Sequence, residues 1–332
     1  MTRDDILRSM FATGGFGLEI GPSYNPLVPK SQGFNVEVLD HTSQTELIEK
    51  YRDIDHTRIE PVDHVCDGRS FTETIGGKGR YDFIVASHVI EHAPDLITFL
   101  RDCEDLLRSD GVLVLAVPDK RHCFDVLRPV STTGAALQAF HERRTRHAPG
   151  VIFDHVSSLT RRGGITGWHI LDRQPFSLGH TLDEAKGHFD AALAGTTYVD
   201  AHAWCFTPAS FRLMIRDFNE LGLLQLKERA FRTTEWFEFF VVLARDGTGC
   251  AMSRLDLLQA VHTELASTAD EVLRLTGEMR ALERALQGLR DLSAARERDR
   301  YLEAVLASTS WRLTRPLRSL GNLLKRGRGT GG

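Results

Sequence analysis

The fold is indicated most clearly by residues 81–119, YDFIVASHVIEHAPDLITFLRDCEDLLRSDGVLVLAVPD. The stretch begins with an apolar, β-branched run, YDFIVAS, and ends with a second one, GVLVLAVPD, as two buried strands would. Between them, apolar residues recur at helical spacing over 94–111, with Pro94 suited to the first turn and Gly111 to the end of a helix. The stretch therefore predicts a strand–helix–strand unit with parallel strands.

The same alternation extends toward the N-terminus. Short apolar runs at 17–21, 34–40 and 62–67 indicate three more strands, and a helix is predicted over 43–53. Repeated alternation of this kind is typical of a doubly wound sheet with parallel strands.

Toward the C-terminus, a predicted helix over 207–222 precedes two apolar runs, 223–231 and 237–245, that are separated by a short turn. Such a hairpin adds one antiparallel strand to the sheet. We therefore predict an α/β fold with a doubly wound, Rossmann-like sheet of seven strands, one of them antiparallel, in a domain that spans 1–248.

Residues 120–205 interrupt this rhythm and are rich in His, Arg, Thr and Gly. They follow a strand directly, and long insertions at the carboxyl end of a strand commonly build part of a binding site. We expect this insertion to form a cap over an acceptor.

Residues 253–300 carry a heptad pattern. Apolar residues recur at spacings of three and four from Leu258 to Leu289, with Thr268 as the only polar member. The pattern predicts a coiled coil that makes the protein a homo-oligomer; the alternative is an amphipathic helix folded back on the domain. The members of the seam are Leu258, Val261, Leu265, Thr268, Val272, Leu275, Met279, Leu282, Leu286 and Leu289.

The last segment, 301–332, is a basic amphipathic tail with six cations and one acid, Glu303, on a chain whose net charge is −4. Leucines and Trp311 lie among these cations, and Pro316 and Gly321 exclude one long regular helix. Two kinds of partner fit the tail, an anionic membrane surface or a glycosyltransferase, and a solvated tail is the alternative.

The composition excludes several classes of protein. No apolar stretch reaches the length of a membrane span, and the N-terminus carries acids without an apolar run, so we expect neither a spanning helix nor a signal peptide. The five cysteines contain no C-x-x-C pair and predict reduced thiols in a cytoplasmic protein, peripheral to the inner face of the membrane if the tail binds lipid. No nucleic-acid partner is expected.

The motif SHVIEH (87–92) contains H-x-x-E-H, the spacing of an inverted zinc peptidase. A zinc helix would need His88, Glu91 and His92 on one continuous helix. The preceding strand ends only at Ser87, and Pro94 is better placed to begin a helix than to lie inside one. No third ligand on a second helix stands out, so we predict a strand-end loop and no metal.

Polar residues and glycines stand at the ends of several predicted strands, where doubly wound sheets bind their ligands. Gly21 lets the backbone turn closely past a ligand, Asp40 is placed to accept from ribose hydroxyls, and Asp67 could meet an exocyclic amine. A G-x-G-x-x-G turn for a pyrophosphate is missing, so a nucleoside without phosphates fits better. The cofactor-binding candidates are Glu19, Gly21, Pro22, Asp40, His41, Asp67, Gly68, Ser87 and His88.

These features resemble those of a class I S-adenosylmethionine-dependent methyltransferase. GLEIGPS is similar to the first motif of that family, VEVLDH to its second strand end, and 81–119 to its fourth-strand–helix–fifth-strand unit. The resemblance covers about residues 1–245 and implies S-adenosylmethionine as the cofactor. One glycine stands where the family commonly has E-x-G-x-G-x-G, so the path of the first loop departs from the family's pattern.

Two segments resemble a narrower group. EIGPSYNPLVPK (19–30) is similar to the opening of methyltransferases linked to bacterial cell-surface polysaccharides, and 308–326 resembles a segment of polysaccharide glycosyltransferases and their methylating partners. The resemblance implies an O-methyltransferase with a sugar or glycan acceptor. The alternatives are an NAD-dependent sugar oxidoreductase or epimerase, and a non-catalytic coiled-coil scaffold in polysaccharide assembly.

Methyl transfer to oxygen needs an acceptor held in line with the methyl group and a residue that can take its proton. His92 is the first candidate base, His88 the second, and His155 and His202 are candidates from the insertion. Each imidazole could instead hydrogen-bond the loop backbone. The predicted contacts with the acceptor are Lys120, Arg121 and Trp204, with surface solvation as the alternative for the two cations.

Overall fold

The computed structural model of the chain describes residues 2–53, 55–66, 68–195 and 199–307. The chain divides into two units, Met1–Asp270 and Glu271–Gly332. Most of the predicted tail, 308–332, and Asp67 lie outside the described residues.

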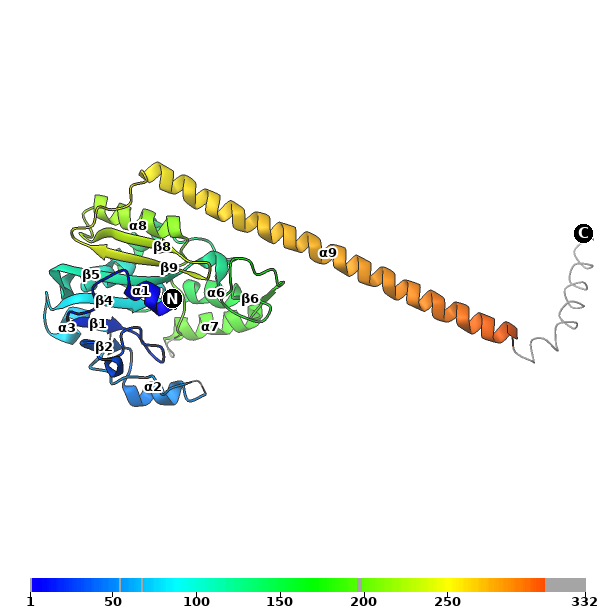
Figure 1. The fold of residues 1–332 in the computed structure, drawn as a ribbon, viewed down its shortest axis with the longest axis horizontal. Helices are drawn as coiled ribbons and strands as arrows, with labels where there is room; N and C mark the ends of the chain where they lie inside the picture. Colours follow the sequence, from blue (N-terminus) through cyan, green and yellow to red (C-terminus); the bar gives the residue numbers. More distant parts are fainter. Residues whose placement is uncertain (1, 54, 67, 196–198, 308–332) are drawn as a thin grey trace, which may run out of the picture. The chain divides into compact units, whose positions relative to one another are not determined.

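A seven-stranded sheet forms the centre of the first unit (Figure 1). Its strands are β1 (Gly17–Ile20), β2 (Val36–Asp40), β3 (His64–Val65), β4 (Tyr81–Ser87), β5 (Leu107–Pro118), β8 (Lys227–Thr233) and β9 (Glu238–Ala244). Their order in the sheet is β3-β2-β1-β4-β5-β9-β8, and β9 alone runs antiparallel to both of its neighbours. The predicted doubly wound sheet with one antiparallel strand is confirmed.

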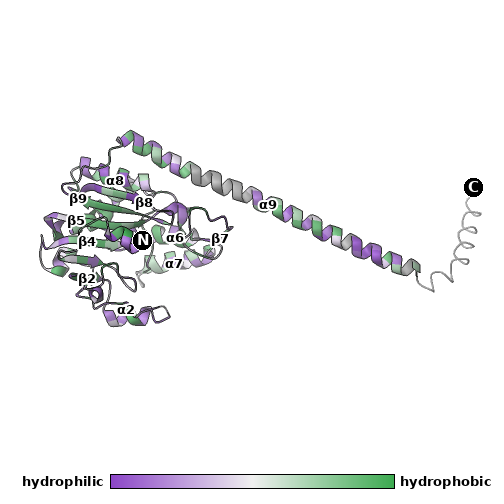
Figure 2. Cartoon of the chain, in the orientation of Figure 1, coloured by the Kyte–Doolittle hydropathy of each residue, from purple (hydrophilic) through white to green (hydrophobic). Residues whose placement is uncertain are grey.

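Helices cover both faces of this sheet. Those of the sheet region are α1 (Arg3–Arg8), α2 (Gln44–Lys50), α3 (Phe71–Ile75), α4 (Leu96–Leu106), α5 (Thr133–Glu142) and α8 (Pro208–Glu220), with a 3-10 turn, η1, at Lys30–Gln32. The larger core contains buried residues of α4, α5 and α8, whereas Leu7 of α1 packs with Leu27 and Val28 in the core of the other face. Figure 2 shows the central strands as the most apolar part of the unit.

The boundaries of the strand–helix–strand unit differ from the prediction. Asp95, not Pro94, caps α4 by accepting from the N–H of Thr98 at 3.0 Å, and the helix ends at Leu106 rather than at Gly111. The strand begins early because Leu107 is buried and pairs with Tyr81 of β4. Tertiary pairing therefore overrides the helical spacing of the last turn.

The insertion carries its own small structure. It comprises η3 (Lys120–His122), α5, α6 (Pro149–Ser157), β6 (Thr160–Arg162), β7 (Phe176–Leu178) and α7 (Leu182–Ala194). Strands β6 and β7 form an antiparallel pair that the sequence analysis did not anticipate. Helices α6 and α7 lie beside each other (Figure 1) around a separate core that includes Ile152, Val156, Ala185 and Ala201.

Helix α9 (Arg254–Ala307) contains the predicted heptad seam. Its first turns pack on α8, where Leu257 is fully buried and Arg254 Nε pairs with Asp217 Oδ1 at 2.7 Å. In the second unit, Leu282 and Leu289 are each 64% exposed. Within the described residues, no helix has the length and apolar character needed to cross a membrane.

Candidate functional site

The turn after β1 passes close to the loop after β4. Because β1, β2 and β4 are parallel neighbours, their carboxyl ends lie at one edge of the sheet. Gly21 has φ +60°, and a Cβ at this position would lie 3.0 Å from Val89 Cγ2. Glycine is therefore required here both by the backbone conformation and by the close approach of the β4 loop.

Glu19 holds the β1 turn from inside. Its carboxylate is 2% exposed and accepts from the backbone N–H groups of Leu27 at 2.6 Å and Val28 at 3.2 Å. Burial raises the pKa of this carboxyl to about 7, although the two N–H groups act in the opposite direction. Glu19 was expected to contact the cofactor; in this structure its two oxygens accept from the N–H groups of the loop, so it also positions the turn.

Asp40 lies at the end of β2 against the same turn. Its carboxylate accepts from the N–H of Ser23 at 3.1 Å and from the N–H of His41 at 2.7 Å, while the His41 ring lies half exposed beside it. Pro22 lies in the turn between Gly21 and Ser23, and the N–H of Ser23 ties this turn to the buried acid where a ribose is expected. Gly68, with φ +93°, is exposed at the end of the third strand.

The loop after β4 begins with a strained residue. His88 has φ +54°, which is unfavourable for a side chain with a Cβ. Its Nε2 lies 2.9 Å from Glu238 Oε2, and Arg3 donates both to Glu238 and to Ser87 Oγ. Burial lowers the pKa of His88, but Glu238 and Glu91 raise it overall to about 9. His88 is therefore a fixed cation at neutral pH and unsuited to act as a base.

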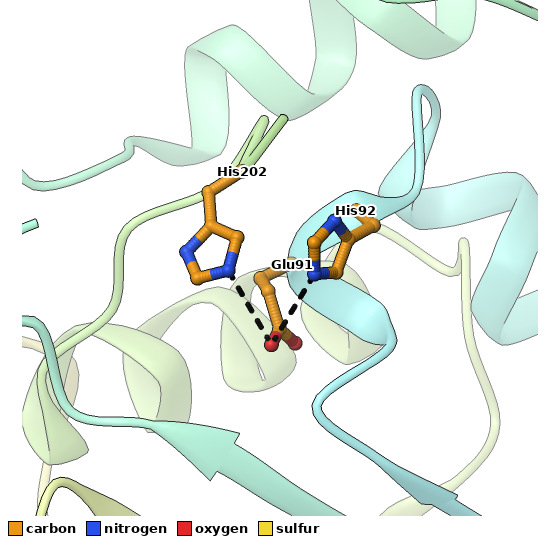
Figure 3. Close-up of side chains that lie close together, drawn as sticks. All are labelled: Glu91, His92 and His202. Carbon is orange, nitrogen blue, oxygen red and sulfur yellow. Dashed lines mark ion pairs between the residues drawn. The ribbon is translucent and has the colours of Figure 1, made fainter. Parts of the chain in front are cut away.

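Glu91 lies at the centre of three histidines. It belongs to the short 3-10 turn η2 (Ile90–His92), is 0% exposed, and has no hydrogen-bond partner at either carboxylate oxygen. Figure 3 shows His92 and His202 turned toward it, with their Nε2 atoms 3.9 Å and 3.8 Å from Oε1. His88 Nδ1 lies 3.6 Å from the same oxygen. These distances are too long for direct hydrogen bonds.

Carboxylates fix the orientation of two of these histidines through their Nδ1 atoms. His92 Nδ1 lies 2.7 Å from Asp200 Oδ1, and His202 Nδ1 lies 2.5 Å from Asp125 Oδ2. Although burial raises the pKa of Asp125, His202 and Arg128 lower it well below its usual range. Each imidazole therefore directs its other nitrogen, Nε2, toward Glu91.

Backbone contacts bring the end of the insertion to η2. The N–H groups of Ala203 and Trp204 both donate to the carbonyl of Glu91, at 2.7 Å and 3.1 Å. The indole N–H of Trp204 donates to the carbonyl of Ala93 at 2.6 Å, and this side chain is buried. Trp204, expected to bind the acceptor, instead clamps the segment that carries His202.

The remaining candidates have internal partners. His155 Nδ1 accepts from the backbone N–H of His202 at 3.2 Å, and burial lowers the pKa of His155 to about 3. Lys120 is 3% exposed and its Nζ donates to the carbonyl of Val126, while Arg121 pairs with Asp119. In this conformation Lys120 does not present its charge to an acceptor.

A cavity of about 730 Å³ opens beside the loop after β4. Its walls combine the histidine–glutamate cluster with aromatic and small residues of the insertion and of the β8–β9 turn. The lining residues include His88, Glu91, His92, His202, Phe124, Arg161, Thr166 and Phe237. The loop after β4 therefore separates the β1 turn from a cavity large enough for a sugar.

Five residues of this arrangement were not candidates in the sequence analysis: Glu91, Arg3, Asp125, Asp200 and Glu238. Only Glu91 had a signal, since it stands inside H-x-x-E-H. The others lie far away in the chain and have no motif around them.

The comparison with protein families gives one match. Residues 7–169 match the family model described as a methyltransferase domain. Among curated proteins, no sequence matches this chain significantly. The matched range contains β1 to β5 and hence the cofactor edge, Glu91 and His92, but it ends before His202.

Solved structures resemble the fold at low identity. A protein of Rhodobacter sphaeroides named as a zinc-dependent alcohol dehydrogenase has a TM-score of 0.41 and 13% identity, over 73% of this chain and 88% of that one. A SAM-dependent methyltransferase of Aquifex aeolicus has 0.35 and 9%, over 73% and 88%. A 1,6-didemethyltoxoflavin-N1-methyltransferase of Burkholderia thailandensis, with bound S-adenosylhomocysteine, has 0.35 and 11%, over 72% and 75%. All three TM-scores are below 0.5, so these likenesses carry no conclusion about activity.

Proposed function

We propose that this S-adenosylmethionine-dependent methyltransferase acts on a hydroxyl oxygen of a sugar, in a bacterial cell-surface polysaccharide or its precursor. The observation that carries the proposal is the cavity of about 730 Å³, which contains histidine side chains and lies against the loop that also contacts the β1 turn. An acceptor in this cavity would lie next to the cofactor edge of the sheet.

The residues of the β1 and β2 ends fit the cofactor. Gly21 gives the β1 turn the positive φ that brings it beside the β4 loop, and the buried carboxylate of Asp40 offers acceptor oxygens for ribose hydroxyls. Bound S-adenosylmethionine supplies an electrophilic methyl group on a sulfonium, which an oxygen attacks while the electron pair of the broken carbon–sulfur bond stays on sulfur. Glu19 holds the turn around this site through Leu27 and Val28.

His92 and His202 are the groups that we expect to act on the proton of the acceptor hydroxyl. Both line the cavity, and both are held by carboxylates that fix the orientation of the ring. His88 is less suited to this role, because its Nε2 lies 2.9 Å from Glu238 Oε2 and is occupied by that contact. His155 is less suited to this role, because its Nδ1 accepts from the backbone N–H of His202, which leaves the ring proton on Nε2.

Two features support a sugar as the acceptor. Phe124 and Phe237 line the cavity, so its wall offers aromatic surface to the C–H face of a sugar ring. The resemblance of 19–30 to polysaccharide-linked methyltransferases points to the same class. An NAD-dependent oxidoreductase is not favoured, because the β1 turn lacks the glycines of a pyrophosphate loop.

The test is methyl transfer from labelled S-adenosylmethionine to nucleotide sugars and to lipid-linked glycan intermediates, with the product located by mass spectrometry. The proposal expects the label on a sugar oxygen. Calorimetry with S-adenosylhomocysteine provides the separate check of cofactor binding. Binding of the cofactor together with transfer only to amines or carboxylates would contradict the sugar assignment.

We also propose that the seam of α9 makes the protein a homo-oligomer through a coiled coil over 253–300. Leu282, Leu286 and Leu289 are each more than half exposed, and a stripe of this kind is costly to leave in water. Light scattering on the full chain should show an oligomer that the L282E/L289E variant loses and that the Glu283→Gln control, outside the seam, keeps. A monomeric wild-type chain would contradict the proposal.

The tail's proposed binding to an anionic membrane or to a glycosyltransferase concerns mainly 308–332, outside the described residues. Vesicle flotation separates the two partners. Flotation with anionic vesicles that salt reverses would favour the membrane, whereas capture by the enzyme without lipid would favour the glycosyltransferase.

A further inference from the structure

Glu91 is a buried acid whose nearest basic neighbours, His88, His92 and His202, lie 3.6–3.9 Å away, too far for hydrogen bonds. It is fully buried, and neither carboxylate oxygen accepts a hydrogen bond. Leaving an ionised carboxylate in this state costs several kcal/mol, because neither water nor a protein donor replaces its lost hydration. A ligand that binds the carboxylate would remove this cost.

The spacing of the surrounding nitrogens fits a metal ion. The Nε2 atoms of His92 and His202 lie 3.9 Å and 3.8 Å from Glu91 Oε1, and a set of ligand atoms, one from each residue, lies within 4.8 Å of one another. Two ligands of one ion, each about 2.0–2.2 Å from it, lie roughly 3–3.5 Å apart. Side-chain shifts of up to about an ångström would therefore close the site, and the present gaps to Glu91 are too wide for hydrogen bonds.

The carboxylates behind the histidines match the surroundings of metal-bound imidazoles. A histidine that binds a metal through one ring nitrogen commonly donates the other N–H to a carboxylate, which fixes its tautomer. Asp200 and Asp125 occupy this position behind His92 and His202. Both Nε2 atoms are thereby left free to bind, and both face Glu91 (Figure 3).

We propose that Glu91, His92 and His202 bind a divalent transition-metal ion on the wall of the cavity. Two imidazoles and one carboxylate suit ions from Mn²⁺ to Zn²⁺ better than Ca²⁺, which prefers oxygen ligands. This departs from the prediction that the motif binds no metal. The motif forms no zinc helix, but its Glu91 and His92 gain a third partner from the insertion.

A metal at this position would leave coordination positions open toward the cavity that all three side chains line. A hydroxyl bound there would lose its proton to water more readily, since a metal lowers the pKa of a bound oxygen. His92 and His202 would then hold the metal that lowers the pKa of the acceptor hydroxyl, and would not themselves take its proton. This role rests on the proposed function, whereas metal binding itself does not.

The first experiment measures Mn²⁺ binding to the full-length protein by calorimetry and by electron paramagnetic resonance. One ion per chain is expected in wild type. Glu91→Gln and His202→Ala should weaken binding by about 100-fold or more, and Asp125→Asn, which changes the carboxylate that positions His202 and also pairs with Arg128, by about 10–100-fold. The matched control is His64→Ala, because His64 also pairs with a carboxylate, Glu37 at 2.9 Å, but belongs to no such cluster.

Thermal unfolding keeps the proposal falsifiable if a variant binds weakly for another reason. Mn²⁺ should raise the unfolding temperature of wild type and of His64→Ala but not that of Glu91→Gln. Equal Mn²⁺ binding by wild type and Glu91→Gln, or no binding to wild type at millimolar Mn²⁺, would overturn the site.

Measurements of methyl transfer test the metal's role in activating the acceptor separately from metal binding itself. Chelation should abolish methyl transfer and Mn²⁺ should restore it, with S-adenosylhomocysteine binding unchanged throughout. Transfer that continues in fully chelated protein would overturn the metal's role in activating the acceptor. If the wild type does not bind S-adenosylhomocysteine at all, the proposed function is refuted, but the Mn²⁺ site is not.

Discussion

Glu19 and Glu91, two buried glutamates, differ in the hydrogen bonds that their carboxylates accept. Glu19 and Glu91 are both buried, yet Glu19 accepts two backbone hydrogen bonds and Glu91 accepts none at its carboxylate. The first is explained entirely by the loop that it holds. The second is surrounded by oriented imidazoles that do not reach it. Burial alone therefore does not separate a carboxylate that holds a backbone turn, as Glu19 does, from one whose oxygens accept no hydrogen bond, as at Glu91.

The surroundings of the two glutamates differ in the same way. The β1 turn is built from residues close in sequence, since Glu19 binds Leu27 and Val28. The cluster at Glu91 gathers side chains from the β4 loop and from the far end of the insertion. The β1 turn, whose buried carboxylate is fully hydrogen-bonded, suits the binding of a cofactor in one fixed position. The cluster at Glu91, whose carboxylate accepts no hydrogen bond, can still bind a ligand.

The largest effect is expected at the Glu91 side. The double variant His92→Ala/His202→Ala should lower turnover by about 10³-fold or more, because both groups that act on the acceptor proton are lost. Cofactor affinity, measured by calorimetry, should stay nearly unchanged. His155→Ala is the control, with a loss below about 10-fold. A larger loss in His155→Ala than in the double variant would place the base in α6.

On the Glu19 side the expected effect is on stability and depends on pH. The pKa of Glu19 is raised by burial from 4.5 to about 7, so the folded state keeps a proton that the unfolded state loses between these values. The stabilisation is complete below pH 4.5 and is lost as the pH rises through 7, in total about 3 kcal/mol. Denaturant unfolding between pH 5 and 8 should show this loss for wild type relative to Glu19→Gln. A pH-independent difference would mean that Glu19 is ionised when buried.

Asp40 should show the next effect, on the cofactor alone. Asp40→Ala removes a charged acceptor for ribose hydroxyls and should cost about 2–3 kcal/mol of cofactor binding by calorimetry. His41→Ala, which keeps the carboxylate, should weaken binding less than about 3-fold. Unchanged affinity in Asp40→Ala would mean that the cofactor lies elsewhere on the edge.

The smallest effect concerns the contact between the two regions. Gly21→Ala should lower the free energy of unfolding by about 1–2 kcal/mol, because φ is +60° and the new Cβ meets Val89. Gly33→Ala is the matched control: its φ is +89°, and nothing lies within 4 Å of a Cβ there. Equal losses in the two variants would mean that the approach of the β4 loop to Gly21 costs nothing.

The amino-acid sequence was enough to predict the sheet, its one antiparallel strand and the polar ends of its first two strands. These follow from local patterns, such as the apolar runs of β4 and β5 and the position of Asp40 after β2. It placed the end of α4 several residues too late, because the pairing of Leu107 with Tyr81 is a contact between strands that spacing along the chain does not contain.

The surroundings of SHVIEH follow from the tertiary structure alone. The motif supplied Glu91 and His92, but the third member, His202, comes from the end of the insertion and is brought in by the bonds of Ala203 and Trp204 to the carbonyl of Glu91. The orienting carboxylates, Asp125 and Asp200, are likewise distant in sequence from His92. A pattern in the sequence records neighbours along the chain, whereas a cluster of this kind depends on how an irregular insertion folds back, which local propensities do not encode.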